Sequence, residues 1–100
     1  IDKEKLKSLS AGAPSMILQN GFGQALAFWV AKGKAEQMVI FNILTRWLKQ
    51  TDMENFGTCQ QPKDFIHKLS VMEQFDYLKN QNEALALLEW VKRFANADLI

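Results

Sequence analysis

The stretch from Asn82 to Leu99 constrains the fold of this chain most, because it is a long amphipathic sequence with the period of an α-helix. Apolar side chains recur every three or four residues and form one broad arc, whereas Glu89, Arg93 and Asn96 fall on the opposite side. An arc this wide needs a large helical surface to cover it. The side chains that we expect in the arc are Ala84, Leu85, Leu87, Leu88, Val91, Phe94, Ala95 and Leu99.

The rest of the chain has the same period. No run of alternating β-branched residues is present, and nearly every apolar stretch repeats at three or four residues. The sequence therefore predicts an all-α fold, a compact bundle of about five to six helices. The 100 residues are 48% hydrophobic, which is typical of one globular domain over residues 1–100. A chain that begins with Ile1 rather than Met is compatible with a missing upstream segment.

Start and stop signals divide the first half of the chain into helices. Gly12 lies in a stretch of small residues that predicts a break, and Pro14 suits the first turn of a helix because its missing amide hydrogen costs nothing there. Gly21 and Gly33 are typical of helix ends. The helical stretches expected in this half are Lys3–Leu9, Pro14–Asn20, Phe22–Lys32 and a last one from Ala35 or Glu36 to about residue 50.

The second half begins with a stretch of little periodicity, Thr51–Gln61, which we expect to be a mobile loop. Pro62 then starts a new helix. Ser70 and Glu73 have the spacing of a capping box, which predicts a further helix start between them. The helices expected here are Pro62–Leu69, Val71–Lys79 and one that Asn82 caps and that ends near Leu99.

Charge and cysteine content limit the class of protein. The net charge is only +1, which argues against a protein that grips nucleic acid unaided. Residues 1–50 carry seven basic and three acidic side chains, whereas residues 51–100 carry five basic and eight acidic ones. No apolar run approaches the roughly 20 residues of a membrane span, and one cysteine forms no intrachain disulfide. We therefore expect a cytoplasmic protein.

Residue types that carry catalysis or bind metals are sparse. His67 is the only histidine and has no cysteine or second histidine beside it in the sequence, so a metal or catalytic role is improbable. Cys59 lies in the expected loop, and a cysteine-dependent enzyme stays a minor alternative. Gly21 and Gly23 precede a helix but lack the Lys-Ser or Lys-Thr ending of a phosphate-binding loop. The sequence predicts no enzyme, no bound metal and no cofactor.

Basic side chains stand next to tryptophans in three places, which permits contact with a nucleic-acid backbone. The periodicity places Trp29 and Trp47 inside, as anchors of the core, and leaves the cations available. On the helix that begins at Ala35 or Glu36, one side is expected to carry a polar stripe without an acid, formed by Asn42, Thr45, Arg46 and Lys49.

The helix Phe22–Lys32 is unusual because neither side is charged. Phe22, Leu26, Trp29 and Val30 share one side, and the small or aromatic residues Ala27, Phe28 and Ala31 form the other. We expect this second side to contact a partner chain or another part of the bundle. A helical protein–protein adaptor without any role in RNA binding is therefore an alternative function.

Two motifs together suggest a family. In the first, a proline and an isoleucine lead to an Asn-Gly turn and a Leu-Ala-Phe helix, with Phe22 where leucine is usual. The matching residues are Pro14, Ile17, Asn20, Gly21, Ala25, Leu26, Ala27 and Phe28. The second resembles Leu-Glu-Trp-Leu-Lys-Arg-Phe-Ala and is matched by Glu83, Ala84, Leu85, Leu88, Trp90, Lys92, Arg93, Phe94 and Ala95. In order and spacing they resemble the small subunit of the Cmr, or type III-B, CRISPR effector complex. The short segment before the first motif departs from the family, whose members start with a longer helix.

This resemblance implies a helical bundle without catalysis of its own, acting in antiviral defence. Such a subunit stacks head to tail in an inner filament beside other subunits and helps to hold crRNA and target RNA. Base pairing there reads the sequence, so the protein needs only shape and phosphate contacts. The basic first half and acidic second half favour head-to-tail stacking. The cations expected to contact RNA are Lys32, Arg46, Lys49, Lys92 and Arg93, with the first three favoured because the polar stripe lacks acids.

Overall fold

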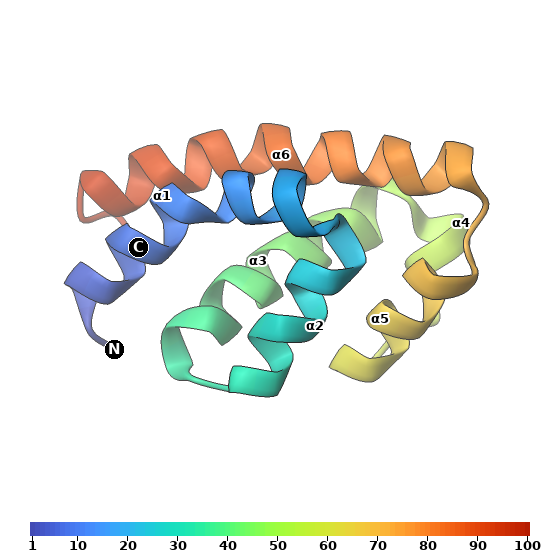
Figure 1. Cartoon of the computed structure of the whole chain (residues 1–100), viewed down its shortest axis with the longest axis horizontal. Helices are drawn as coiled ribbons and strands as arrows, with labels where there is room; N and C mark the ends of the chain where they lie inside the picture. The colour runs from blue at the N-terminus through green and yellow to red at the C-terminus, as the bar shows by residue number, and fades with distance from the viewer.

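The computed structural model describes residues 1–100 as six helices without a strand, which confirms the all-α prediction (Figure 1). Gly21 and Gly33 end helices with positive φ angles of 95° and 65°, a conformation that glycine adopts without strain. The helices are α1 (Lys3–Asn20), α2 (Phe22–Lys32), α3 (Ala35–Thr51), α4 (Met53–Phe56), α5 (Pro62–Val71) and α6 (Gln74–Asn96).

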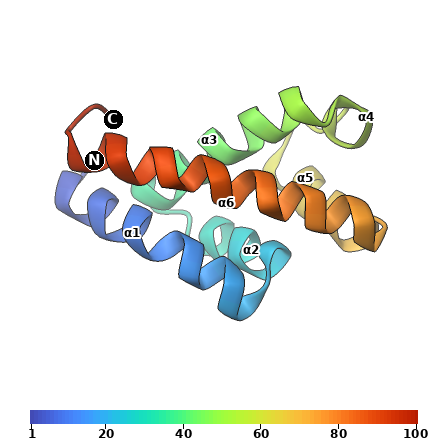
Figure 2. The same ribbon diagram turned by 90° about the horizontal axis from the view of Figure 1, so that it is seen from above.

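Helix α6 spans the length of the molecule. Its 23 residues measure about 34 Å at 1.5 Å per residue, and the longest dimension of the molecule is 36 Å. Seen from above, α6 lies between α1 and α3, and no other helix covers its outer face (Figure 2). Helices α2 and α5 complete the bundle on the side of α6 that faces the rest of the molecule (Figure 1).

One cluster of 18 buried residues forms the core. Trp29 and Phe22 from α2 are completely buried, which confirms Trp29 as a core anchor. Phe41, Phe56 and Phe65 bring α3, α4 and α5 together, and the rings of Phe56 and Phe65 stack with centroids 5.7 Å apart. The aromatic content of the chain is thus largely used to hold the helices together.

The break expected near Gly12 is wrong, because α1 runs without interruption through Gly12 and Pro14. Ser10, Ala13 and Ile17 are buried on one face of α1 and keep the helix packed on both sides of Pro14. This packing outweighs the one intrahelical hydrogen bond that proline cannot donate.

The helix starts expected at Ser70 and Asn82 are also wrong. The Ser70 hydroxyl donates to the His67 carbonyl within α5, Glu73 is the N-cap residue of α6, and α6 then continues through Asn82. Neither glycine nor proline occurs between residues 72 and 97. The buried Asn80 side chain donates to Asp52 and to the Asp76 carbonyl, so its polar group is satisfied inside the helix.

The segment Thr51–Gln61 is packed rather than a plain loop. Asp52 caps the short helix α4 by accepting a hydrogen bond from the Asn55 amide at 3.2 Å. Phe56 and Cys59 are buried in the core. A helical turn this short has no recognisable period in a polar sequence. One N-cap and one buried aromatic residue are enough to stabilise it.

Two members of the expected apolar arc on α6 lie outside the core. Phe94 is 42% exposed and packs beside Trp90, and Leu99 follows the end of the helix and is 71% exposed. The buried face of α6 is narrower than expected and consists of Asn80, Ala84, Leu88, Val91 and Ala95.

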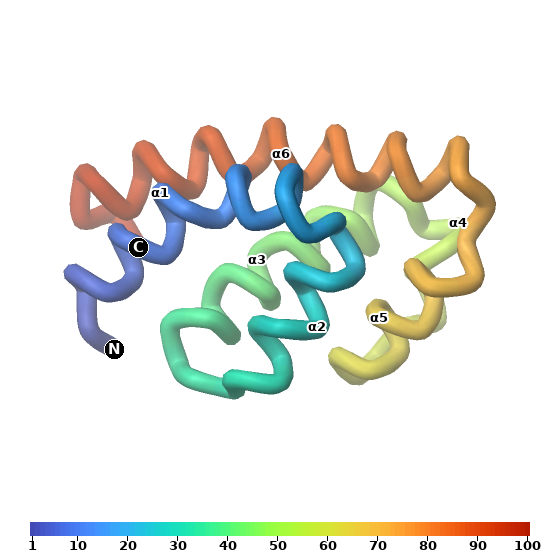
Figure 3. Tube along the Cα trace, in the orientation of Figure 1, coloured from blue at the N-terminus to red at the C-terminus, as the bar shows by residue number.

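The two chain ends lie at the same end of the molecule (Figure 3). The Lys7 ammonium contacts the Asp98 carboxylate at 3.1 Å and joins α1 to the residues after α6. The charge and hydrogen bond of Asp98 raise the pKa of Lys7. None of the six helices has the length and hydropathy that a membrane crossing requires.

Candidate nucleic-acid interface

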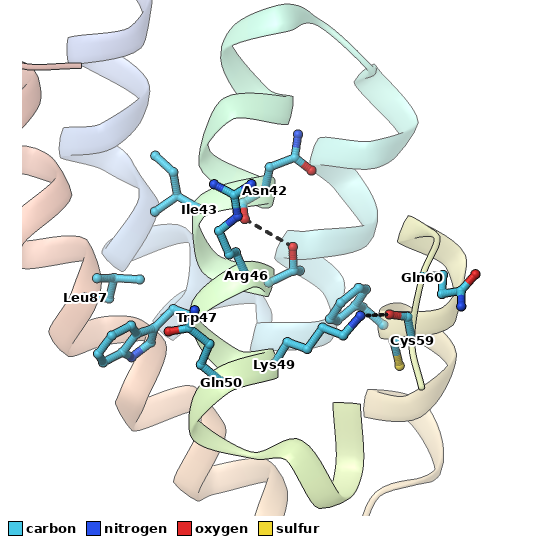
Figure 4. A pocket seen from close by; sticks show the side chains of 11 residues that line it. Asn42, Ile43, Arg46, Trp47, Lys49, Gln50, Cys59, Gln60 and Leu87 are labelled. Atoms are coloured by element: carbon cyan, nitrogen blue, oxygen red, sulfur yellow. Dashed lines mark hydrogen bonds between the residues drawn. The ribbon is translucent and has the colours of Figure 1, made fainter. Parts of the chain in front are cut away.

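A groove beside α3 brings two of the expected cations together (Figure 4). Arg46 and Lys49 stand one turn apart on α3, and the segment before α5 forms the other wall. No aspartate or glutamate lines the groove. Its lining residues are Asn42, Ile43, Thr45, Arg46, Trp47, Lys49, Gln50, Cys59, Gln60, Phe65 and Leu87.

The two cations of the groove differ in how firmly they are held. The Arg46 side chain is exposed and forms no hydrogen bond or ion pair with the chain. Lys49 is half-buried, and its Nζ donates to the Cys59 carbonyl at 2.9 Å (Figure 4). Arg46 is therefore the more available charge, and Lys49 also ties α3 to the segment before α5.

Two side chains of α3 differ from their expected positions. Trp47 is not fully buried but 38% exposed, because its Nε1 donates to Glu83 Oε1 at the edge of α6, 2.7 Å away. Thr45 is not on the exposed stripe: it is buried, and its hydroxyl donates to the Phe41 carbonyl at 2.9 Å. A helical period places residues on a face only to within part of a turn, so residues at the edge are easily misassigned.

The other three expected cations lie outside the groove. Lys32 ends α2, and its Nζ lies 5.6 Å from the centre of the Phe28 ring. Arg93 lies over the Trp90 ring at 5.2 Å, and Lys92 beside it is half-buried. Both contacts have the geometry of cation–π interactions, which leave the charge available to solvent.

The expected partner surface on α2 is only partly exposed. Phe28 is 45% exposed and Ala31 is exposed, whereas Ala27 is half-buried. The exposed part of this surface is thus Phe28, with the Lys32 ammonium over its ring, and Ala31.

The two side chains with catalytic potential, His67 and Cys59, differ in exposure. His67 is exposed on α5, whereas Cys59 is buried, with only 4% of its surface exposed. Burial, with the nearby Asp64 charge, raises the pKa of the Cys59 thiol and makes it a poor nucleophile. No three histidine, cysteine, aspartate or glutamate side chains are grouped as metal ligands.

Gly23, in the first turn of α2, has a structural partner on α6. The Gly23 amide donates to the Tyr77 hydroxyl of α6 at 2.9 Å, and a side chain on Gly23 would place its first carbon 3.6 Å from that oxygen. That distance is ordinary van der Waals contact, so close packing alone does not require a glycine at residue 23. The Gly23 amide is already paired with Tyr77 and is not available to a phosphate.

Sequence reasoning missed the far wall of the groove. Gln60 and Cys59 follow α4 by only a few residues and reach the groove because Phe56 is anchored in the core. Gln50 was expected only as the end of a helix, and Leu87 only in the core. The pairing of Trp47 with Glu83, 36 residues away, has no local sequence signal.

Comparison with known proteins decides the family. The model of a family described as "CRISPR-associated protein (Cas_Cmr5)" matches residues 1–98. The chain belongs to this Cmr5 family. One relative, the "CRISPR system Cmr subunit Cmr5" of Thermus thermophilus, is 29% identical over 91 residues, which cover 91% of this chain and 72% of that protein. Membership confirms the resemblance to the small subunit of the Cmr, or type III-B, complex. No solved structure matches the chain significantly.

Proposed function

We propose that the chain is a non-catalytic subunit of a type III-B CRISPR effector complex and helps to hold crRNA and target RNA through contacts with the phosphate backbone. Family membership along nearly the whole chain supports the complex as its setting. The observation that carries the RNA contact is the groove beside α3, where Arg46 and Lys49 stand together and no carboxylate belongs to the lining.

Backbone contact suits this groove better than reading of bases. Arginine and lysine need only charge and reach to contact a phosphate, and Asn42, Gln50 and Gln60 add uncharged donors. The net charge of +1 is too small for independent binding. The chain by itself therefore binds RNA only weakly. Its contacts become effective within the complex, where neighbouring subunits supply most of the positive charge.

The decisive experiment measures target-RNA capture by the assembled complex as a function of salt. Arg46→Glu is the cleanest change, because the Arg46 side chain has no polar partner inside the chain. The variant should weaken capture and flatten the salt dependence by about 0.7 to 0.9 log units per log unit of salt for each phosphate that is no longer bound. Lys49→Glu should add to this effect, with thermal unfolding measured in parallel because this change also removes the bond to the Cys59 carbonyl.

The matched control reverses two charges elsewhere. Lys3 and Lys5 are exposed in the first turn of α1, where glutamate is favoured by the helix dipole. The Lys3→Glu/Lys5→Glu variant should capture RNA like the unchanged protein. If Arg46→Glu behaves like this control, the groove is not an RNA site. Lys32, Lys92 and Arg93 are then tested in the same way.

Assembly with neighbours is the second part of the proposal. The excess of basic residues in the first half and of acidic residues in the second favours head-to-tail stacking of copies beside other Cmr subunits. Phe28, with Ala27 and Ala31, is the proposed contact on α2, because an exposed aromatic ring beside small residues fits a partner surface. Phe28→Ser should lower incorporation into the complex without unfolding the chain.

A protein adaptor without an RNA role is the alternative, and the exposure of Phe28 is the observation that favours it. Copurification separates the two functions. Recovery with Cmr subunits and guide RNA supports the first proposal, whereas recovery with unrelated proteins and no RNA supports the adaptor.

A further inference from the structure

No other helix covers the outer face of α6 (Figure 2), and several large apolar side chains of this helix are exposed. Phe75 is 77% exposed and Trp90 is 54% exposed, and Leu78 flanks the same face. Six residues follow one another along the middle of this face, which we call the α6 seam: Phe75, Lys79, Asn82, Ala86, Glu89 and Arg93.

The α6 seam has the spacing of a helix–helix contact. Its members are separated by four, three, four, three and four residues, which is the alternation of the contact positions in a coiled coil. The series is also symmetric about residue 84. Phe75 and Arg93 are equally far from that point, and so are Lys79 and Glu89, and Asn82 and Ala86.

This symmetry makes the seam complementary to itself when a second copy is turned end to end. An antiparallel pair of α6 helices places Lys79 of each copy opposite Glu89 of the other. It also places Phe75 of each copy opposite Arg93 of the other, so that two contacts between a cation and an aromatic ring can form. Ala86 lies near the centre, where its small side chain lets the two helices approach.

Two charges of the seam, Lys79 and Glu89, form no ion pair within the chain. The ion pairs within the chain are those of Lys7 with Glu4 and Asp98, so neither Lys79 nor Glu89 has an ionic partner of its own. An unrelated apolar partner would account for Phe75 and Trp90 but not for the opposite charges at matched distances from the centre. The arrangement therefore favours a second copy as the occupant.

We propose that the isolated chain forms an antiparallel, two-fold pair through the α6 seam. This pair is closed, in contrast to the head-to-tail stack proposed above, and it leaves the α3 residues Arg46 and Lys49 outside the contact. One helix face about 27 Å long is smaller than a standard interface of about 800 Å² per partner, so the pair is weak and depends on concentration.

Sedimentation equilibrium of the full chain without RNA tests the pair. The average mass should rise from 11.5 kDa toward twice that value between roughly 10 µM and 1 mM, the range expected of a small interface. Lys79→Glu and Glu89→Lys each create two like-charge contacts and should raise the dissociation constant at least about tenfold. The double variant Lys79→Glu/Glu89→Lys restores opposite charges and should return the constant to within about threefold of the original.

The control exchanges charges away from the seam. Glu54→Lys/Lys63→Glu alters one residue of α4 and one of α5 and should leave the mass unchanged, with circular dichroism confirming that every variant is folded. A single species of 11.5 kDa up to 1 mM overturns the pair. The pair is also overturned if Phe75→Ser abolishes the association but the single charge variants leave it unchanged. It is overturned as well if the double variant has a dissociation constant as high as those of the single variants. Each outcome is independent of RNA capture through Arg46.

Discussion

The indole Nε1 of Trp47 donates a hydrogen bond to Glu83 Oε1 at 2.7 Å, and this contact joins α3 to α6 at the edge of the groove. It explains why Trp47 stays 38% exposed at a position where periodicity favours burial. The ring leans against α6 while its polar end faces the carboxylate, which is the usual arrangement of a tryptophan at the boundary of a core.

Replacing Trp47 with phenylalanine keeps an aromatic ring but removes this donor. Hydrogen bonds to charged groups contribute about 1.5 to 3 kcal/mol, and partial exposure lowers the value here to about 1 kcal/mol. The melting temperature should fall by about 4 to 8 °C in thermal unfolding. Trp90→Phe is the matched control, because Trp90 is 54% exposed and has no hydrogen bond. Equal losses in both variants would show that the Trp47 contact adds nothing.

Asp52 joins three parts of the chain through its carboxylate. One oxygen caps α4, and the other accepts hydrogen bonds from the side chains of Asn55 at 2.8 Å and Asn80 at 2.9 Å. Partial burial raises the pKa of Asp52, but the hydrogen bonds from Asn80 and Asn55 outweigh it and leave the pKa below its usual value. The folded state therefore binds a proton at Asp52 less readily than the unfolded state.

Asp52→Ala should lower the free energy of unfolding at pH 7 by about 1 to 2 kcal/mol, since a cap and a bond to buried Asn80 are removed. A carboxyl whose folded pKa is depressed stabilises the fold above its unfolded pKa of about 3.9, and the contribution disappears as pH falls through the folded pKa. Denaturant titrations from pH 6 to pH 2 should therefore show the gap between the two proteins closing below about pH 4. Glu54→Ala, at an exposed position of α4, should show no such closing.

The sequence predicted the helical class and some helix ends, because these depend on local chemistry. Gly21 and Gly33 stop helices where the chain must adopt a positive φ, and both positions were expected. The predicted ends that failed were decided by distant contacts. Asn80 looked like part of a linker and is instead a buried donor to Asp52, 28 residues away.

The candidate site was predictable to a similar extent. Spacing on α3 was enough to place Arg46 and Lys49 one turn apart. The wall that Gln60 forms opposite them depends on how Phe56 packs against Phe65, and a linear sequence carries no signal for that. Trp90 belonged to a recognisable motif, but its exposure followed only from the position of α6 on the outside of the bundle.

Tyr77 supplies the acceptor for the Gly23 amide at the start of α2. Tyr77→Phe keeps the edge-to-face contact with Phe22, whose ring centre lies 6.2 Å away, and leaves the amide without that partner. The free energy of unfolding should fall by about 1 kcal/mol, the usual net value of one hydrogen bond. Hydrogen exchange of the Gly23 amide should also become faster. Unchanged exchange would contradict a stabilising role of the hydroxyl.

Pro14 lies inside α1, where it cannot donate a hydrogen bond to the Ser10 carbonyl one turn earlier. Proline in a helix interior is about 3 kcal/mol less favourable than alanine. Part of that cost is offset here because the ring is half-buried and restricts the unfolded chain. Pro14→Ala should therefore raise the free energy of unfolding by about 1 to 3 kcal/mol, measured by denaturant titration. Ser15→Ala, at the next and exposed position, should change it by less than about 0.5 kcal/mol. A loss of stability in Pro14→Ala would mean that packing of the proline ring contributes more than the missing hydrogen bond.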